Sequence, residues 1–221
     1  MMFKVVEMFI SINGEGTHSG QLAFFVRFAG CNLNCSFCDT KWANEENVSY
    51  TLMSADDIYN KIKASGIKNV TLTGGEPLLR DGIYELLTLL SKDKELYIEI
   101  ETNGSIDLMP FMDIDNRPSM TMDYKLPFSN MESYMNKNNL SLLGKNDTVK
   151  FVCANKKDLD RAKEIIDKYE LTKHCNVYLS PVFGEINPDT MVEYMKDNLM
   201  NDVTLQLQMH KVIWDPNARG V

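Results

Sequence analysis

Short apolar runs of strand length alternate with helical patterns along most of this chain. The runs are rich in β-branched and aromatic residues and cover positions 22–28, 70–73, 96–100, 119–123, 148–153 and 177–179. Apolar residues at helical spacing cover 54–64, 82–90, 159–169 and 188–199. Alternating strands and helices predict parallel pairing, because a parallel pair needs a crossover connection. Since six strands are too few for a closed eight-stranded barrel, we predict an α/β fold: a partial, open TIM-like barrel of mainly parallel strands with crossover helices.

The chain length and the net charge limit the number of domains and the kinds of binding partner that we expect. No Pro-, Gly- or Ser-rich linker divides the 221 residues, so we expect a single domain over 1–221. The net charge of −8 argues against non-specific binding to nucleic acid or to an anionic membrane, which both need clustered Lys and Arg. The sequence shows neither a signal-peptide pattern nor an apolar segment long enough to span a membrane, so we expect a cytoplasmic protein.

Polar or glycine-rich segments follow five of the predicted strands. They cover residues 30–38, 74–77, 101–104, 124–125 and 180–181. In folds of this class, ligands bind at the carboxyl ends of the strands. The sequence therefore predicts one shared binding mouth at that end of the barrel.

Three of the five cysteines, Cys31, Cys35 and Cys38, lie close together with the spacing C-x3-C-x2-C. Thiolates are ligands for zinc or for iron–sulfur clusters. Structural zinc takes four ligands, and a fourth could come from Cys153 or Cys175, although neither belongs to a second paired motif. Three neighbouring thiolates favour a [4Fe–4S] cluster with one iron free of cysteine, because an electron carrier is held by four. We interpret Cys153 and Cys175 as buried apolar residues.

The triplet spacing resembles that of the radical S-adenosylmethionine (SAM) superfamily, in which the open iron binds the methionine moiety of SAM. Phe37 then matches the aromatic residue beside adenine. The segment 73–77, Thr-Gly-Gly-Glu-Pro, resembles the motif that engages the methionine amino group. Glycines allow close backbone approach to a ligand, and the carboxylate of Glu76 can accept a hydrogen bond from an ammonium group.

Further features resemble the 7-carboxy-7-deazaguanine synthase family within that superfamily. These are the segment 11–16, Arg27, Thr40 and the tail around 207–216. Members of that family contract the ring of 6-carboxy-5,6,7,8-tetrahydropterin to give 7-carboxy-7-deazaguanine with loss of ammonia, in the biosynthesis of queuosine and other 7-deazapurines. The resemblance implies a lyase with a modified partial barrel, a homodimer, a requirement for Mg²⁺, and an external low-potential reductant such as flavodoxin or ferredoxin.

The same resemblance implies the roles of individual residues. Substrate contacts are expected at Ile12, Asn13, Gly14, Glu15, Arg27, Thr73, His210 and Pro216. SAM contacts are expected at Phe37, Cys38, Asp39, Gly74, Gly75, Glu76, Asp123, Tyr124, Lys125, Ser180, Pro181, Val182 and Phe183. Cys31, Cys35 and Cys38 would hold the [4Fe–4S] cluster, and Thr40 would bind Mg²⁺. No side chain is assigned as a catalytic group, because the radical is generated at the cluster.

Two alternatives remain open at this point. A glycyl-radical-activating enzyme shares the cysteine triplet, but it does not account for residues 13–15, Arg27 and His210. A zinc-stabilised binding module without catalysis would account for the cysteines alone. We interpret Trp42 and residues 45–46 as part of a solvated connection.

Overall fold

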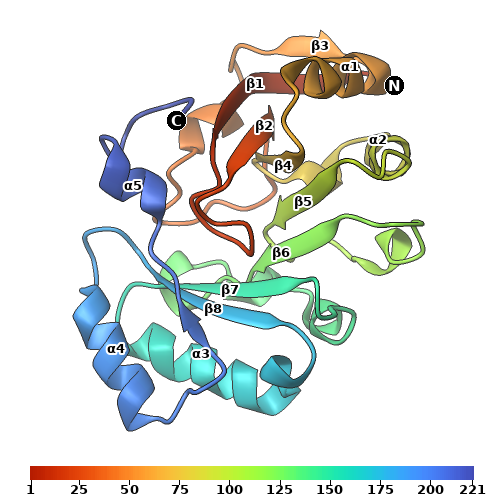
Figure 1. Ribbon diagram of the computed structural model, residues 1–221. Helices are drawn as coiled ribbons and strands as arrows, with labels where there is room; N and C mark the ends of the chain where they lie inside the picture. The colour runs from red at the N-terminus through yellow and green to blue at the C-terminus, as the bar shows by residue number, and fades with distance from the viewer.

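The computed structural model describes residues 1–221, and its centre is one nine-stranded sheet (Figure 1). The strand order is β3-β1-β2-β4-β5-β6-β7-β8-β9. The strands are β1 Phe3–Ile12, β2 Leu22–Phe28, β3 Thr51–Met53, β4 Asn69–Gly74, β5 Tyr97–Thr102, β6 Ser119–Asp123, β7 Thr148–Cys153, β8 Asn176–Pro181 and β9 Thr204–Leu205. All neighbours from β2 to β9 pair in parallel, whereas β1 pairs antiparallel with both β2 and β3.

The predicted fold class is confirmed. The six predicted strands are β2 and β4 to β8, and the sheet is open because β3 and β9 form its two edges. Strands β1, β3 and β9 were not predicted from the sequence. Strand β1 carries a bulge between Val5 and Glu7, which interrupts its alternation, and β3 and β9 have only three and two residues.

α-Helices lie in the crossover connections before β4, β5, β8 and β9, whereas the connections from β5 to β6 and from β6 to β7 contain only 3-10 turns. The α-helices are α1 Ala55–Ser65, α2 Ile83–Ser91, α3 Lys156–Tyr169, α4 Pro188–Asp197 and α5 Met209–Ile213. Short 3-10 turns cover Lys41–Asn44, Pro77–Leu79, Met109–Phe111, Pro127–Ser129, Glu132–Tyr134, Lys137–Ser141 and Leu171–Lys173. None of the helices is long and apolar enough to cross a membrane.

Local sequence signals account for where the helices begin and end. Helix α1 starts at the predicted capping box, in which the Asp57 backbone N–H donates to Ser54 Oγ at 3.1 Å and the Ser54 N–H donates to Asp57 Oδ2 at 3.0 Å. It ends at Gly66, whose φ of 71° suits a residue without a side chain. Helix α4 has the predicted Pro188 in its first turn.

The hydrophobic core lies between the sheet and the helices on its outer side (Figure 1). Successive residues of a strand point to opposite faces. In β4, Val70 and Leu72 are fully buried in the same 43-residue cluster as Ile58 of α1 and Leu86 of α2. Truncating one of these side chains to Ala is expected to cost about 2–5 kcal/mol of stability. The core therefore occupies the outer face of the sheet and leaves the other face for polar residues.

Candidate functional site

The inner face of the sheet carries polar side chains on each strand from β2 to β7. Strand registers place Arg27 beside Thr73, Thr71 beside Glu99, Glu101 beside Thr121, and Asp123 beside Lys150. Residues paired directly across neighbouring strands project to the same face. These side chains thus share one concave surface, which leads up to the carboxyl ends of the parallel strands, as the sequence predicted.

The cysteine loop begins directly after β2, at this end of the sheet. All three thiols are free; Cys35 is buried, while Cys31 and Cys38 are partly exposed. Burial raises the pKa of the Cys35 thiol, and the cation of Lys125 acts in the opposite direction. An ammonium close to the thiols favours their thiolate forms, which are the ligands of a metal cluster.

The thiols suit a cluster better than a single ion. No three His, Cys, Asp or Glu side chains converge as the ligands of one metal ion would. Structural zinc needs such convergence of four ligands, whereas the cysteines of a four-iron cluster are spread over several irons. The Cys31 sulfur already accepts N–H groups from Leu33, at 3.4 Å, and Asn103, at 3.5 Å. The donor set therefore fits a [4Fe–4S] cluster.

The two glycines after β4 allow the strand ends to approach closely. A Cβ on Gly74, whose φ is 139°, would lie 2.3 Å from the carbonyl oxygen of Phe28. A Cβ on Gly75 would lie 2.1 Å from the carbonyl oxygen of Gly30. In addition, the N–H of Glu76 donates to the Gly30 carbonyl at 3.0 Å. The glycine motif thus fixes the start of the cysteine loop against the end of β4.

Glu76 lies beneath the surface of the site and is fully buried. Its carboxylate accepts hydrogen bonds from the Leu78 N–H at 3.0 Å, the Thr102 hydroxyl at 2.9 Å and the Asn103 N–H at 2.6 Å. Burial raises its pKa, and these hydrogen bonds oppose the rise. A carboxylate offers about four acceptor positions. Three of them are used by these hydrogen bonds, which connect the loop after β4 with the end of β5. The predicted contact with a SAM ammonium would use the remainder.

Arg27 is held by a residue that the sequence analysis did not single out. Its Nε donates to Glu7 Oε1 at 2.7 Å, across the antiparallel pair of β1 and β2. The Nη1 and Nη2 groups make no hydrogen bond within the protein. The guanidinium therefore keeps two parallel donors free for an anion, as its predicted role requires.

The loop between β1 and β2 closes one side of the concave face. Asn13 is buried, and its side-chain oxygen accepts from the Thr71 hydroxyl at 2.9 Å. Glu15 forms an ion pair with Lys150 at 3.0 Å and also accepts from the Ser180 hydroxyl at 3.3 Å. Residues far apart in the sequence thus meet at the predicted substrate loop, together with the partly buried Ile12.

The C-terminal segment packs against the same loop. The side chain of Gln206 makes two hydrogen bonds with the backbone of Gly16, at 2.8 and 3.0 Å, and the N–H of Met209 donates to the Gly14 carbonyl at 3.2 Å. A Cβ on Gly14 would lie 2.4 Å from Nδ1 of His210. Burial lowers the pKa of His210, so its ring is neutral near pH 7. In Figure 1, α5 lies at the left of the sheet, between β1 above it and β7 and β8 below it.

Two cations of the C-terminal segment also contact the residues that follow the cysteine loop. Lys211 pairs with Asp39 at 3.1 Å, and the Arg219 guanidinium lies 4.1 Å from the centre of the Trp42 ring. Trp42, expected in a solvated connection, is therefore covered by the tail. The Thr40 hydroxyl lies 3.6 Å from the Cys38 sulfur. Pro216 is partly buried in the same tail.

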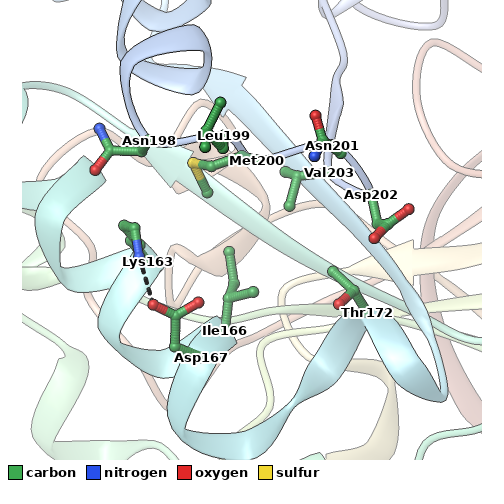
Figure 2. Close-up of a pocket in the computed structure, with 10 residues that line it drawn as sticks. All are labelled: Lys163, Ile166, Asp167, Thr172, Asn198, Leu199, Met200, Asn201, Asp202 and Val203. Carbon is green, nitrogen blue, oxygen red and sulfur yellow. Dashed lines mark hydrogen bonds and ion pairs between the residues drawn. The ribbon is translucent and has the colours of Figure 1, made fainter.

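A separate hollow of about 110 Å³ lies between α3 and the segment after α4 (Figure 2). Figure 2 shows the Lys163–Asp167 ion pair on one side of it and Leu199 and Met200 on another. None of the predicted site residues lines this hollow. It therefore does not form part of the mouth.

Comparison with known proteins agrees with this geometry. The model of the radical SAM superfamily matches residues 25–198. The chain is 61% identical to the 7-carboxy-7-deazaguanine synthase of Clostridium acetobutylicum over 100% of both proteins, and 36% identical to that of Chlorobaculum tepidum over 99% of this chain and 97% of the relative. The chain belongs to the 7-carboxy-7-deazaguanine synthase family. Its fold matches the crystal structure of QueE from Escherichia coli with a TM-score of 0.75 at 22% identity over 95% of each chain.

Membership of the 7-carboxy-7-deazaguanine synthase family places the chain among the radical SAM enzymes, which use a [4Fe–4S] cluster and SAM. Neither a glycyl-radical-activating enzyme nor a zinc-stabilised binding module is favoured by these matches. The three cysteines and the glycine motif both lie within the matched residues.

Some of the residues predicted to bind SAM have side chains near Phe37, and others have side chains that point elsewhere. Lys125 pairs with Asp123 at 2.7 Å and lies 5.9 Å from the centre of the Phe37 ring, and Phe37 also packs beside Val182. Tyr124 differs: its ring is buried in the outer core, and burial raises the pKa of its hydroxyl to about 12. Only the backbone of Tyr124 is thus near the mouth. Pro181 is buried and Phe183 is exposed.

Several polar residues of the site were not singled out from the sequence. These are Glu7, Glu99 and Lys150, whereas Glu101 and Asn103 were predicted only as part of the polar segment 101–104. All but Glu7 lie in or directly after β5 or β7. The sequence signal for the charged residues among these was a charge at alternate positions of an otherwise apolar strand, which indicates a side chain on the inner face. Glu7 could have been found only with β1 recognised as the antiparallel partner of β2.

Proposed function

We propose that this chain is a 7-carboxy-7-deazaguanine synthase, a lyase that converts 6-carboxy-5,6,7,8-tetrahydropterin to 7-carboxy-7-deazaguanine with loss of ammonia. The observation that carries the proposal is 61% identity over 100% of both chains to a relative of that name. The geometry supports it, because the thiols, the free Arg27 donors and the covered loop 13–16 face one mouth. When bound, the cluster and SAM supply the radical that removes a hydrogen atom from carbon 6 of the pterin.

Arg27 binds the substrate carboxylate in this proposal. A guanidinium presents a planar pair of donors that matches a carboxylate, and Glu7 fixes the plane of Arg27 through Nε. Because Nη1 and Nη2 are free, binding the substrate does not require the Glu7 contact to break. The pterin would then lie between Arg27, Thr73 and the loop that carries Asn13.

The chain also excludes water from the radical. Gln206 and Met209 attach the C-terminal segment to residues 14–16, and the neutral ring of His210 covers Gly14. A closed, dry pocket prevents side reactions of the radical and holds the reacting atoms close together. We assign His210 and Pro216 to this cover and to contact with the pterin.

Residues at the ends of β6 and β8 would form the SAM subsite. Lys125, paired with Asp123, offers a cation next to Phe37, and the backbone of residues 180–183 passes the same region. Phe37 lies parallel to Phe128 with ring centres 6.1 Å apart, so an aromatic surface is available for adenine. Gly74, Gly75 and Glu76 would complete the subsite from the end of β4.

Thr40 is proposed as the ligand of Mg²⁺. Its partly exposed hydroxyl lies next to Cys38 and can reach a cation shared with the substrate. Magnesium keeps several waters and needs few protein ligands, so one hydroxyl together with substrate oxygens is a suitable site. The nearby Asp39 is engaged by Lys211.

The remaining assignments concern the state of the protein in the cell. We propose a single domain over 1–221, since all nine strands belong to one sheet. We also propose a homodimer in the cytoplasm that receives electrons from a flavodoxin or ferredoxin and binds neither nucleic acid nor membrane. Five free cysteines are in keeping with a reducing compartment. Light scattering of the anaerobic protein would measure the oligomeric state directly.

An anaerobic turnover assay tests the proposed function. The reconstituted protein is incubated with the carboxy-tetrahydropterin, SAM, Mg²⁺ and a reductant, and the product is followed by its absorbance and mass. Formation of 7-carboxy-7-deazaguanine is expected, with none from a Cys35→Ala control. A protein that carries its cluster and cleaves SAM but forms no deazaguanine would contradict the proposal.

A further inference from the structure

The three thiols of the cysteine loop have different surroundings. The Cys31 sulfur accepts two N–H groups, from the Leu33 backbone at 3.4 Å and from Asn103 Nδ2 at 3.5 Å. The Cys38 sulfur has only the Thr40 hydroxyl at 3.6 Å. Hydrogen bonds to the sulfurs, together with nearby charge, set the reduction potential of an iron–sulfur cluster. Cys31 is thus the thiol that accepts hydrogen bonds from nitrogen donors, whereas Cys35 is the buried thiol on which the Lys125 cation acts.

The orientation of the Asn103 amide is fixed by its neighbours. Its Oδ1 accepts from both the N–H and the hydroxyl of Ser105, at 3.0 and 2.6 Å, so this atom must be the oxygen. Nδ2 is therefore the end that points at the Cys31 sulfur, and its second hydrogen goes to Asn32 Oδ1 at 2.9 Å. Asn32 Nδ2 in turn donates to Ser105 Oγ at 2.8 Å, which completes a ring of hydrogen bonds.

Buried Glu76 holds the backbone of Asn103 in place. The Asn103 N–H donates to Glu76 Oε2 at 2.6 Å, and the Thr102 hydroxyl donates to Oε1 at 2.9 Å. Asn103 itself is only 7% exposed. The amide next to Cys31 is thus rigid and shielded from water, and a hydrogen bond is stronger in such a place than in water.

Arg80 brings a positive charge to the same cysteine. Its Nη1 donates to the Ala29 carbonyl at 2.8 Å, two residues before Cys31, and lies 3.5 Å from where a Cβ on Gly30 would be. Its Nε is buried without a partner, and no carboxylate pairs with the guanidinium. Cys31 and Glu76 are close enough for their charges to act on Arg80. The guanidinium is only partly buried, but no carboxylate pairs with it directly, so its charge acts on the charges around it, those of Cys31 and Glu76 included.

We propose that Asn103 and Arg80 are positioning residues that raise the reduction potential of the cluster at its Cys31 ligand. Reduction adds negative charge to the cluster, and both an N–H donor to the sulfur and a nearby cation stabilise that added charge. The inference rests on the cluster ligands of the proposed function. It gives Arg80, and Asn103 from the predicted segment 101–104, a role in how readily the cluster accepts the electron used to cleave SAM.

Redox titration of the reconstituted protein, followed by electron paramagnetic resonance without SAM or pterin, tests this inference. Asn103→Ala and Arg80→Met are each expected to lower the equilibrium constant for one-electron reduction about tenfold, which corresponds to a midpoint about 59 mV more negative. Arg80→Lys keeps a cation and should retain most of the wild-type value. Ser105→Ala is the matched control, because it alters the same ring without removing the donor to sulfur, and its midpoint should stay unchanged.

Wild-type midpoints in both Asn103→Ala and Arg80→Met would overturn the proposal. Asn103→Asp, which has the shape of Asn but no N–H donor, guards against loss of the cluster through disturbed packing. If both Asn103 variants fail to hold iron while Ser105→Ala holds it, Asn103 has only a structural role and the proposal is wrong for that residue. Because no pterin is present, these potentials are independent of the turnover assay, so the two proposals can fail separately.

Discussion

Replacing Arg27 tests how the substrate carboxylate is bound. In Arg27→Ala, the two free Nη donors are lost, while the cysteine loop is left intact. Hydrogen bonds to charged groups contribute about 1.5–3 kcal/mol. A two-donor contact at a guanidinium whose side chain is only 16% exposed should lie near the upper end of that range. Since about 1.4 kcal/mol is a factor of ten, the KM for the pterin should rise about 100-fold.

Part of that loss comes from Glu7. Once Arg27 is removed, the Glu7 carboxylate, 20% exposed, has no partner and repels the carboxylate of the substrate. Two charges about 4 Å apart in water repel each other by about 1 kcal/mol. The double variant Glu7→Gln/Arg27→Ala should therefore bind the pterin roughly fivefold better than Arg27→Ala alone.

The assay is anaerobic steady-state kinetics, with iron content and SAM cleavage measured in parallel. Both control measurements should match the wild type, since Arg27 lies within β2 and not in the cysteine loop. Arg27→Lys keeps the charge but not the planar pair of donors, so its KM should lie between those of the wild type and Arg27→Ala. An unchanged KM in Arg27→Ala would refute the carboxylate role, and equal values for the single and double variants would refute the repulsion by Glu7.

Three further predictions follow from the site. Replacing any one of the three loop cysteines by Ala should abolish the brown absorbance of the reconstituted protein and its turnover; retention of four irons per chain would contradict the ligand assignment. Gly75→Ala should prevent cluster assembly, as measured by iron and sulfide content, because its Cβ would lie 2.1 Å from the Gly30 carbonyl oxygen; Gly144→Ala, where a Cβ meets only Asp147 Oδ2 at 3.9 Å, is the control. Burial raises the pKa of Glu99 to about 7, with repulsion by Glu101 adding to the shift. The native state therefore binds this proton more tightly than the unfolded chain, and stability should fall as the pH rises from about 4.5 through 7, by at most about 3 kcal/mol. Glu99→Gln should flatten that dependence in urea unfolding, and an unaltered pH profile would show that Glu99 is not its source.

Features with a local sequence signal could be predicted. The six inner strands could be predicted because apolar residues recur at alternate positions on their buried outer face, and the Ser54–Asp57 box marks the start of α1. The cysteine spacing predicts the cluster ligands without any knowledge of the fold. Strand β1 was missed because its role depends on antiparallel pairing with β2 and on a bulge, neither of which appears in its own residues.

Side-chain direction was harder to predict than position. The glycine motif does not show that Glu76 is buried and joins two loops; Tyr124 follows the right strand, but its ring points into the core. The ion pair of Lys150 with Glu15 joins residues 135 positions apart. Such contacts depend on the folded sheet, and a motif cannot show which face a side chain takes.

The attachment of the C-terminal segment has a consequence for how the protein matures. Gln206 and Gly16 are 190 positions apart, so the last wall of the pocket can form only when nearly the whole chain has left the ribosome. The cysteine loop lies far ahead of that segment in the order of synthesis. The wall that Gln206 helps to form is therefore the last part of the pocket to be completed, after the thiols that hold the cluster are already in the chain.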